Sequence, residues 1–114
     1  MSAPRLVDAV IVLTTIATST DGEALARTLV AERLAACVNL LPEMWSIYQW
    51  KGELTADRER QLIIKTTEAR LDALRARLHQ LHPYEVPEFL VLPITGGSIE
   101  YLRWLAEGTA IEER

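Results

Sequence analysis

The side chain with the clearest potential for chemistry is a histidine that stands directly before a proline. His82 precedes Pro83, and the residue before a proline favours extended backbone, which would place this imidazole at the mouth of a strand. Imidazole is the commonest metal ligand and suits copper and zinc. The alternative is a histidine that only hydrogen-bonds to the next loop or to a partner in a cleft, because metal sites need three or four ligands.

Two further side chains could supply metal ligands. His79 lies three residues before His82, a spacing that can place both on one helical face, but Pro83 ends such a helix. A solvated surface histidine is therefore the interpretation we prefer for His79. Cys37 is the single cysteine, and it is either a soft ligand or a small buried strand residue. One cysteine allows no internal disulfide, as is compatible with a reducing cytosol.

Composition and motifs exclude several classes of function. A net charge of −4 and a pI of about 5.2, with no basic run, give no attraction to nucleic acid or to anionic membranes. The apolar segment Val10–Leu13 is too short for a signal core or a membrane span, so we expect a cytoplasmic protein. Gly96-Gly97 lacks the spacing and lysine of a phosphate loop, and no G-x-S-x-G motif occurs, so we expect no enzyme.

The elements that must position these residues begin with a buried strand over Leu6–Thr15. Thr20 and Glu23 have the spacing of a capping box and predict a helix that follows. Strand character returns at Ala36–Leu41, and Pro42 predicts a bulge there because proline cannot donate to the ladder. Trp45–Trp50 then alternates, with Ser46, Tyr48 and Trp50 on one side and Trp45, Ile47 and Gln49 on the other.

A turn at Lys51–Glu53 and a strand over Leu62–Thr66 complete a long hairpin. Leucines at helical spacing from Leu71 to Leu81 predict a second helix that Pro83 stops. A strand over Glu88–Ile94 and a final helix, capped by Ser98 and ending near Gly108, follow. The pattern predicts an α+β, ferredoxin-like βαββαβ fold with an extra C-terminal helix. We expect one domain over residues 1–114, with short flexible termini at about 1–5 and 108–114.

Four segments resemble the CutA divalent-cation-tolerance family, in order and with the expected gaps. They are Glu32–Asn39, Ser46–Gly52 with Ile64–Thr66, His82–Glu88 and Tyr101–Trp104. The resemblance implies a compact homotrimer, similar in architecture to PII signalling proteins, in which hairpins pair with neighbouring subunits and each cleft is lined from two chains. Exposed sheet edges and an aromatic hairpin also favour an oligomer. We expect interface positions at Trp45, Tyr48, Trp50 and Trp104; an aromatic ligand pocket formed by Tyr48, Trp50 and Trp104 is the alternative.

The resemblance also implies where ligands would bind. Family members proposed to bind copper carry a cysteine at the end of the first strand and paired histidines before the proline; this chain has Thr14 and Leu81 there, which leaves His82, with Cys37 as a further candidate. Family positions at the inter-subunit cleft correspond to Glu59, Lys65, Tyr84, Glu85 and Glu88. Lys65 closes the apolar run Leu62–Ile64, so it needs an anionic partner: Glu59, Glu85, or a ligand carboxylate or phosphate. An ion pair that bridges two subunits is the structural alternative to a bound ligand.

The sequence thus leaves three hypotheses open. The first is a cytosolic trimeric protein that responds to metal ions, with Cu²⁺ or another divalent cation as its ligand. The second is a PII-like sensor that binds a small anionic metabolite between subunits. The third is a non-catalytic assembly or anchoring platform, suggested by the aromatic hairpin. No nucleic acid or membrane partner is expected in any of them.

Overall fold

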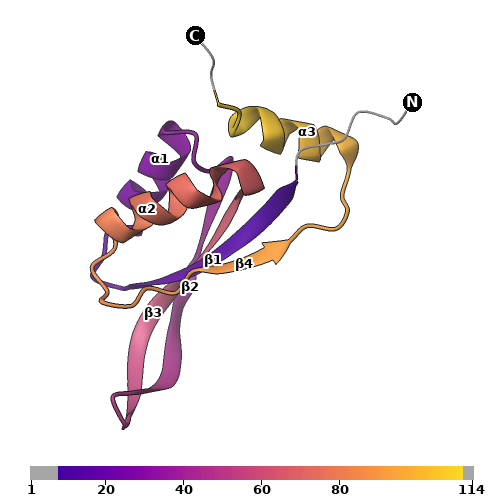
Figure 1. Ribbon diagram of the computed structural model, residues 1–114. Coiled ribbons are helices and arrows are strands. Elements are labelled where there is room, and N and C mark those ends of the chain that lie inside the picture. Colours follow the sequence, from indigo (N-terminus) through magenta and orange to yellow (C-terminus); the bar gives the residue numbers. More distant parts are fainter. Residues whose placement is uncertain (1–7, 112–114) are drawn as a thin grey trace.

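The computed structural model describes residues 8–111 and builds them into one antiparallel sheet with helices on it (Figure 1). The elements are β1 (Ala9–Ala17), α1 (Gly22–Ala31), β2 (Cys37–Trp50), β3 (Glu53–Thr67), the short 3₁₀ turn η1 (Glu68–Arg70), α2 (Leu71–Leu81), β4 (Leu90–Pro93) and α3 (Ile99–Gly108). The strands lie in the order β2-β3-β1-β4. The predicted α+β, ferredoxin-like fold with an extra C-terminal helix is confirmed.

Alternate residues of the central strands form the core. Val12 and Ile16 of β1 are buried with Leu62 of β3, and α1 and α2 cover this side with Leu29 and Leu74. The opposite parity faces the other side of the sheet, because successive strand residues point in opposite directions. We call the apolar residues there the open-face patch: Ile11, Leu13, Ile63, Leu90 and Leu92, which are cross-strand neighbours.

A hairpin of two long strands projects from the rest of the molecule (Figure 1), whose longest dimension is 56 Å. Lys51 and Gly52 both have positive φ, 50° and 82°, as a two-residue turn between antiparallel strands requires. The pairing of β2 with β3 shifts register between Leu40 and Glu43, which confirms the bulge expected at Pro42. β3 begins at Glu53, so the predicted strand over Leu62–Thr66 was too short at its start.

Local signals for helix ends were right in two places and wrong in one. The Ser98 hydroxyl accepts a hydrogen bond from the Tyr101 amide at 3.3 Å, so Ser98 caps α3 as expected. α2 ends at Leu81, before Pro83. The capping box at Thr20 is wrong: Asp21 caps α1, its carboxylate accepting from the Ala24 amide at 3.0 Å.

At the C-terminal side, the hydrogen-bonded structure of α3 includes a residue beyond Gly108. Thr109 is buried and its hydroxyl donates to the Leu105 carbonyl at 3.0 Å, so ordered structure continues past Gly108. The Arg33 side chain donates to the carbonyls of Glu107 and Ala110, which holds the end of α3 against the end of α1. The expected flexible segment 1–5, and the strand start at Leu6, lie outside the described residues.

One buried hydroxyl predicts a stabilising substitution. Thr14 is fully buried on the core side of β1, and among residues 8–111 its Oγ1 has no hydrogen-bond partner. An unsatisfied buried hydroxyl costs about 1–3 kcal/mol. Thr14→Val is therefore expected to raise the free energy of unfolding by about 1 kcal/mol in urea denaturation.

Thr66→Val is the matched control. Thr66 is equally buried, but its hydroxyl donates to the Leu34 carbonyl at 2.7 Å, so the same substitution there should lower the free energy of unfolding. If both variants were destabilised alike, the Thr14 hydroxyl would have a partner in solution and the prediction would be wrong.

Candidate functional site

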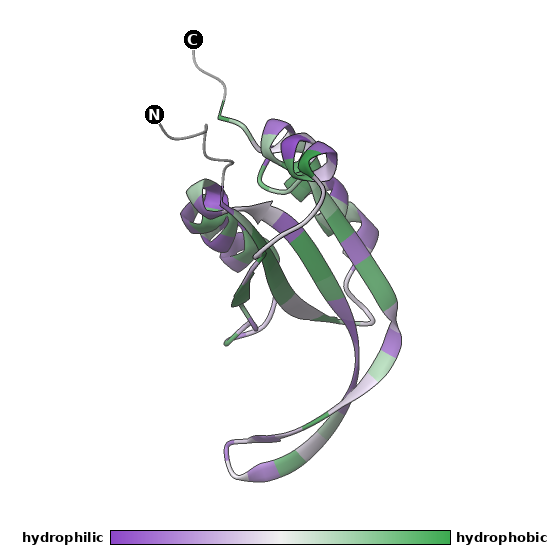
Figure 2. Ribbon diagram, turned by 90° about the vertical axis from the view of Figure 1, so that its right-hand side faces the viewer, coloured by the Kyte–Doolittle hydropathy of each residue, from purple (hydrophilic) through white to green (hydrophobic). Residues whose placement is uncertain are grey.

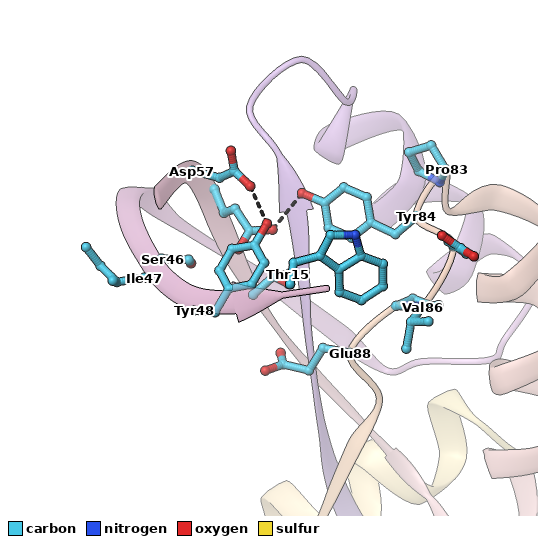
Figure 3. A pocket seen from close by; sticks show the side chains of 13 residues that line it. Thr15, Ser46, Ile47, Tyr48, Asp57, Pro83, Tyr84, Val86 and Glu88 are labelled. Carbon is cyan, nitrogen blue, oxygen red and sulfur yellow. Dashed lines mark hydrogen bonds between the residues drawn. The ribbon is translucent and has the colours of Figure 1, made fainter. Parts of the chain in front are cut away.

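A cleft of about 760 Å³ lies between the projecting hairpin and the loop that joins α2 to β4 (Figure 3). The bend of the hairpin, visible in Figure 2, brings the concave side of β2 and β3 toward this loop. The lining comes from four places: Thr15 at the end of β1; Ser46, Ile47, Tyr48 and Trp50 of β2; Asp57 and Glu59 of β3; and loop residues 83–88. We call it the Tyr84 cleft.

A tyrosine and a glutamate form the buried centre of the Tyr84 cleft. The Tyr84 hydroxyl donates to a Glu59 carboxylate oxygen at 2.6 Å, and only 6% of Glu59 is exposed. Partial burial raises the pKa of Tyr84 far above its usual value of 10, and the hydrogen bond to Glu59 raises it further because both favour the neutral phenol. Tyr84 therefore stays a hydrogen-bond donor throughout the physiological pH range.

A second pair of the same kind lies beside it. The Tyr48 hydroxyl donates to a carboxylate oxygen of Asp57, and this hydrogen bond raises the pKa of Tyr48 above 10. Figure 3 shows the Tyr48–Asp57 pair of the hairpin close to Tyr84, which reaches across from the loop. Each of the two phenols thus donates a hydrogen bond to one of the two carboxylates.

These pairs predict a pH dependence at the alkaline end. As the pH rises past about 10, tyrosines of the unfolded chain lose their protons first, while Tyr84 in the folded chain keeps its own, so the free energy of unfolding falls. In a spectrophotometric titration of the three tyrosines, Tyr48 should ionise later than a free tyrosine, and Tyr84 should ionise last, well above pH 10. Tyr84→Phe should remove that late step and make the alkaline loss of stability less steep; an unchanged titration would contradict the assignment.

His82 uses both ring nitrogens for hydrogen bonds. Nε2 lies 2.6 Å from the Thr15 carbonyl oxygen, and Nδ1 accepts from the Tyr84 amide at 3.2 Å. The ring is 6% exposed and lies 4.6 Å from the Tyr84 ring, centroid to centroid. The carbonyl requires a proton on Nε2, and the amide requires a bare Nδ1, so the ring is neutral in this arrangement. His82 thus joins the end of β1 to the loop, as the hydrogen-bonding alternative described.

The candidate metal ligands do not meet within one chain. Cys37 pairs with Lys65, which in turn pairs with Ile11, whereas His82 contacts Thr15, four residues further along β1. Strand rise and spacing place Cys37 about 15 Å from His82. Cys37 is half-buried and His79 is exposed. Across residues 8–111, no group of three or more His, Cys, Asp or Glu side chains could hold a metal ion.

Lys65 does not belong to the Tyr84 cleft. It lies six residues from Glu59 on β3, or about 20 Å along the strand. Its Nζ instead lies 3.4 Å from the Tyr101 hydroxyl of α3 and 5.6 Å from the centre of that ring. Within one chain the projecting strand separates Lys65 from Glu59, so an ion pair of Lys65 with Glu59 or Glu85 across two subunits stays a prediction.

The other predicted cleft residues do meet. Glu59, Tyr84, Glu85 and Glu88 all line the Tyr84 cleft, and Glu88 accepts from the Gln61 side chain at 3.0 Å. Sequence reasoning missed Asp57, which lies opposite Ser46 in the observed register of the hairpin.

The four aromatic residues assigned to an interface divide into two sets. Tyr48 and Trp50 line the Tyr84 cleft. Trp45 faces the other side of the hairpin, with the Arg58 guanidinium 5.2 Å from its ring centre, and Trp104 packs against Tyr101 on α3. All four are exposed in the single chain. Trp104 lies apart from the Tyr84 cleft, and the interface assignment of all four residues stays a prediction.

The fold and these motifs can be compared with known proteins. Residues 10–108 match the family model of the CutA1 divalent ion tolerance protein. The chain belongs to this family. The divalent-cation tolerance protein CutA of Thermus thermophilus is 48% identical over 99 residues, which cover 87% of this chain and 96% of that protein. A chloroplastic CutA 1 of Oryza sativa is 43% identical over 108 residues, 95% of this chain and 61% of that protein.

Solved CutA structures have the same fold. The crystal structure of CutA1 from Oryza sativa superposes with a TM-score of 0.89 at 42% identity, covering 94% of this chain and 98% of that one. A structure described as the PII-like protein CutA from Nostoc sp. PCC 7120 in apo form gives a TM-score of 0.83 at 37% identity, covering 90% and 99%. The Thermus thermophilus relative is named a divalent-cation tolerance protein.

Two positions differ from the copper-ligand pattern implied for CutA proteins, and the structure shows what they do instead. Thr14 is fully buried. Leu81 is partly buried and packs against the hydrophobic core. Neither side chain offers copper a ligand in this chain. In the described part of the chain, no helix has the length and apolar character needed to cross a membrane.

Proposed function

We propose that this CutA-family chain forms a homotrimer that takes part in the response to divalent metal ions without catalysing a reaction. The match to the divalent ion tolerance family over residues 10–108 carries this proposal. It is supported by relatives named for divalent-cation tolerance across most of their length. The cytoplasm is the proposed compartment, supported by the single cysteine; cell fractionation tests it, since a plant relative is named chloroplastic.

The surface of the single chain supports an oligomer. On the open-face side α3 contacts Lys65 through Tyr101, whereas Leu90 and Leu92 of the open-face patch are 53% and 43% exposed. Trp45, Ile47 and Leu54 on the outer side of the hairpin are 63–76% exposed. A monomer rarely leaves so much contiguous apolar surface in water. Three-fold closure would cover the patch and the hairpin together.

Sedimentation velocity at micromolar concentration tests the assembly. The expected mass is about three times the 12.8 kDa of the chain. A monomer would overturn the trimer and leave the exposed tryptophans unexplained.

A resident copper ion does not fit the donors of one chain. His82 has both nitrogens engaged, and Cys37 lies too far away to share an ion. Binding of Cu²⁺ by His82 remains a proposal: the ring would have to give up its contact with Thr15 or with Tyr84. Calorimetric titration of tag-free protein with Cu²⁺ and Zn²⁺ tests it. Saturable binding that is lost in His82→Ala supports ligation there, and no saturable binding removes His82 as a ligand while leaving the family intact.

A PII-like sensor remains a second candidate, favoured by one observation. The Lys65 ammonium lies beside Tyr101 at the α3 end of the sheet, where a small anion could reach both. A thermal-shift screen of nucleotides and organic acids should then show a hit in the wild type that is lost in Lys65→Gln. A screen without any such hit argues against the sensor.

A further inference from the structure

The end of α1 holds an arginine in a backbone conformation that usually selects glycine. Arg33 has a φ of 61°. Its amide donates to the Val30 carbonyl, and the Leu34 amide donates to the Leu29 carbonyl, both at 3.0 Å. This pair of hydrogen bonds is the Schellman motif, whose left-handed position is most often glycine because a side chain there costs energy. Arg33 is therefore expected to make a contact that offsets this cost.

The Arg33 side chain makes such a contact with the end of α3. Its Nε donates to the Ala110 carbonyl at 3.1 Å, and its Nη2 donates to the Glu107 carbonyl. Carbonyls at the C-terminal end of a helix carry partial negative charge, so a guanidinium is a favourable partner for them. Because one planar group holds both carbonyls, the contact restrains the orientation of the end of α3 as well as its distance from α1.

The backbone of Arg33 is held from the other side by η1. The Arg70 Nε donates to the Arg33 carbonyl at 3.2 Å, and its Nη2 donates to the Glu32 carbonyl at 3.5 Å. The side chain that reaches α3 thus starts from a backbone that α1 and η1 fix together. All of these contacts are made within one chain, so they do not depend on how chains assemble.

Other contacts hold α3 to the sheet only lightly. Among residues Ile99–Gly108 only Leu105 is buried, whereas α1 buries four residues. Just beyond the helix, the Thr109 hydroxyl oxygen lies 3.4 Å from that of Thr67 on β3. A helix that buries so little apolar surface gains little free energy from docking, and such elements open locally while the rest of a structure stays folded.

The segment before α3 can act as a hinge. The Ile94 amide donates to the Ala9 carbonyl at 3.1 Å and fixes the chain at the end of β4. Gly96 and Gly97 follow, and a Cβ at Gly96 would meet no atom within 4 Å, so this segment lies in open space. Glycine permits large changes of φ and ψ at little steric cost. Rotation about these two residues would move α3 as a unit.

We propose that Arg33 is the latch of a hinged C-terminal helix. With the latch closed, α3 lies on the sheet and Tyr101 contacts Lys65. With the latch open, α3 moves away about Gly96 and Gly97 while the sheet, α1 and α2 stay folded, and Leu105 becomes exposed. Arg33 thus sets how often this end of the sheet opens to solvent. The inference goes beyond the proposed response to metal ions and does not depend on it.

Hydrogen exchange of the full, assembled protein, measured by mass spectrometry, tests the latch. Arg33→Gly removes the guanidinium and also the cost of the left-handed backbone, so the midpoint of urea unfolding should change little. We expect the amides of α3 to exchange about tenfold faster than in the wild type, the effect of losing about one hydrogen bond to a charged group. The amides of α1 should change by less than about twofold.

Arg103→Ala is the matched control. Arg103 is an exposed arginine on α3 itself, so its replacement removes the same charge from the helix and should change exchange of α3 by less than about twofold. Arg33→Asn, which also tolerates the left-handed backbone, replaces Arg33→Gly should that variant fail to fold. Unchanged exchange of α3 would overturn the latch. Equal acceleration in α1 and α3 would overturn it too, because Arg33 would then only end α1.

Discussion

His82→Ala is expected to lower the free energy of unfolding by roughly 3 kcal/mol, one of the largest losses for any single polar side chain of this protein. The imidazole is nearly buried and bridges the Thr15 carbonyl to the Tyr84 amide. Alanine would leave both backbone groups without this partner and would open a space beside the Tyr84 ring. Because the bridge links β1 to the loop that carries Tyr84, the cleft should loosen together with the fold.

Urea denaturation followed by circular dichroism measures this loss, in metal-free buffer so that ligand binding does not contribute. His79→Ala is the matched control: His79 is exposed on α2, and its replacement should change the free energy of unfolding by less than about 0.5 kcal/mol. Similar stability of the two variants would show that the bridge contributes little, and would make the His82 ring readily available to Cu²⁺.

The stability of His82→Ala tests whether His82 is a structural bridge in this chain. If His82 is a structural bridge, its position before Pro83 is explained by the extended backbone there, which turns the ring toward β1. Thr14 is buried and Leu81 packs against the core, so neither side chain supplies a second metal ligand beside His82. This agrees with a structural role for His82. The same residue type at the same place in the chain can thus support a loop without holding a metal.

Sequence patterns predicted the elements of the fold where each element has one buried and one exposed side. Leucine spacing gave α2 its range from Leu71 to Leu81, and Pro42 marked the bulge in β2. The charged start of β3, Glu53–Gln61, was not recognised, because most of its residues are exposed in the single chain and its one buried residue, Glu59, is itself charged, so no apolar alternation marks the strand. Thr20 and Asp21 are both good capping residues, so sequence alone did not choose between neighbours.

The candidate site was predicted in part. Within one chain, Glu59, Tyr84, Glu85 and Glu88 lie together in one cleft, and Lys65 lies apart from them on the continuous strand from Glu53 to Thr67. The predicted cleft lies between subunits, so its full set of residues stays a prediction. The tyrosine–carboxylate pairs could not be predicted either, because they depend on the hairpin register and on the bend toward the loop. Residue types thus indicated which side chains could form a site, and the bend of the hairpin determined which of them line the cleft.

Leu92→Lys is expected to convert the proposed trimer to monomers. Leu92 lies on β4 opposite Ile11, within the open-face patch, and is 43% exposed in the single chain. If subunits cover this patch, the substitution would bury three ammonium groups per trimer without partners, and burying even one unpaired charge costs several kcal/mol. The single chain should still fold, because Leu92 points away from the core.

Val30→Lys is the control, since Val30 is 41% exposed but lies on α1, on the helical side of the sheet. It should sediment as the wild type does, while Leu92→Lys should sediment as a monomer. A Leu92→Lys trimer would mean that subunits meet through the outer side of the hairpin, where Trp45, Ile47 and Leu54 are exposed. In that case Trp45→Ser should dissociate the assembly instead, so the two substitutions together decide which apolar surface holds the subunits.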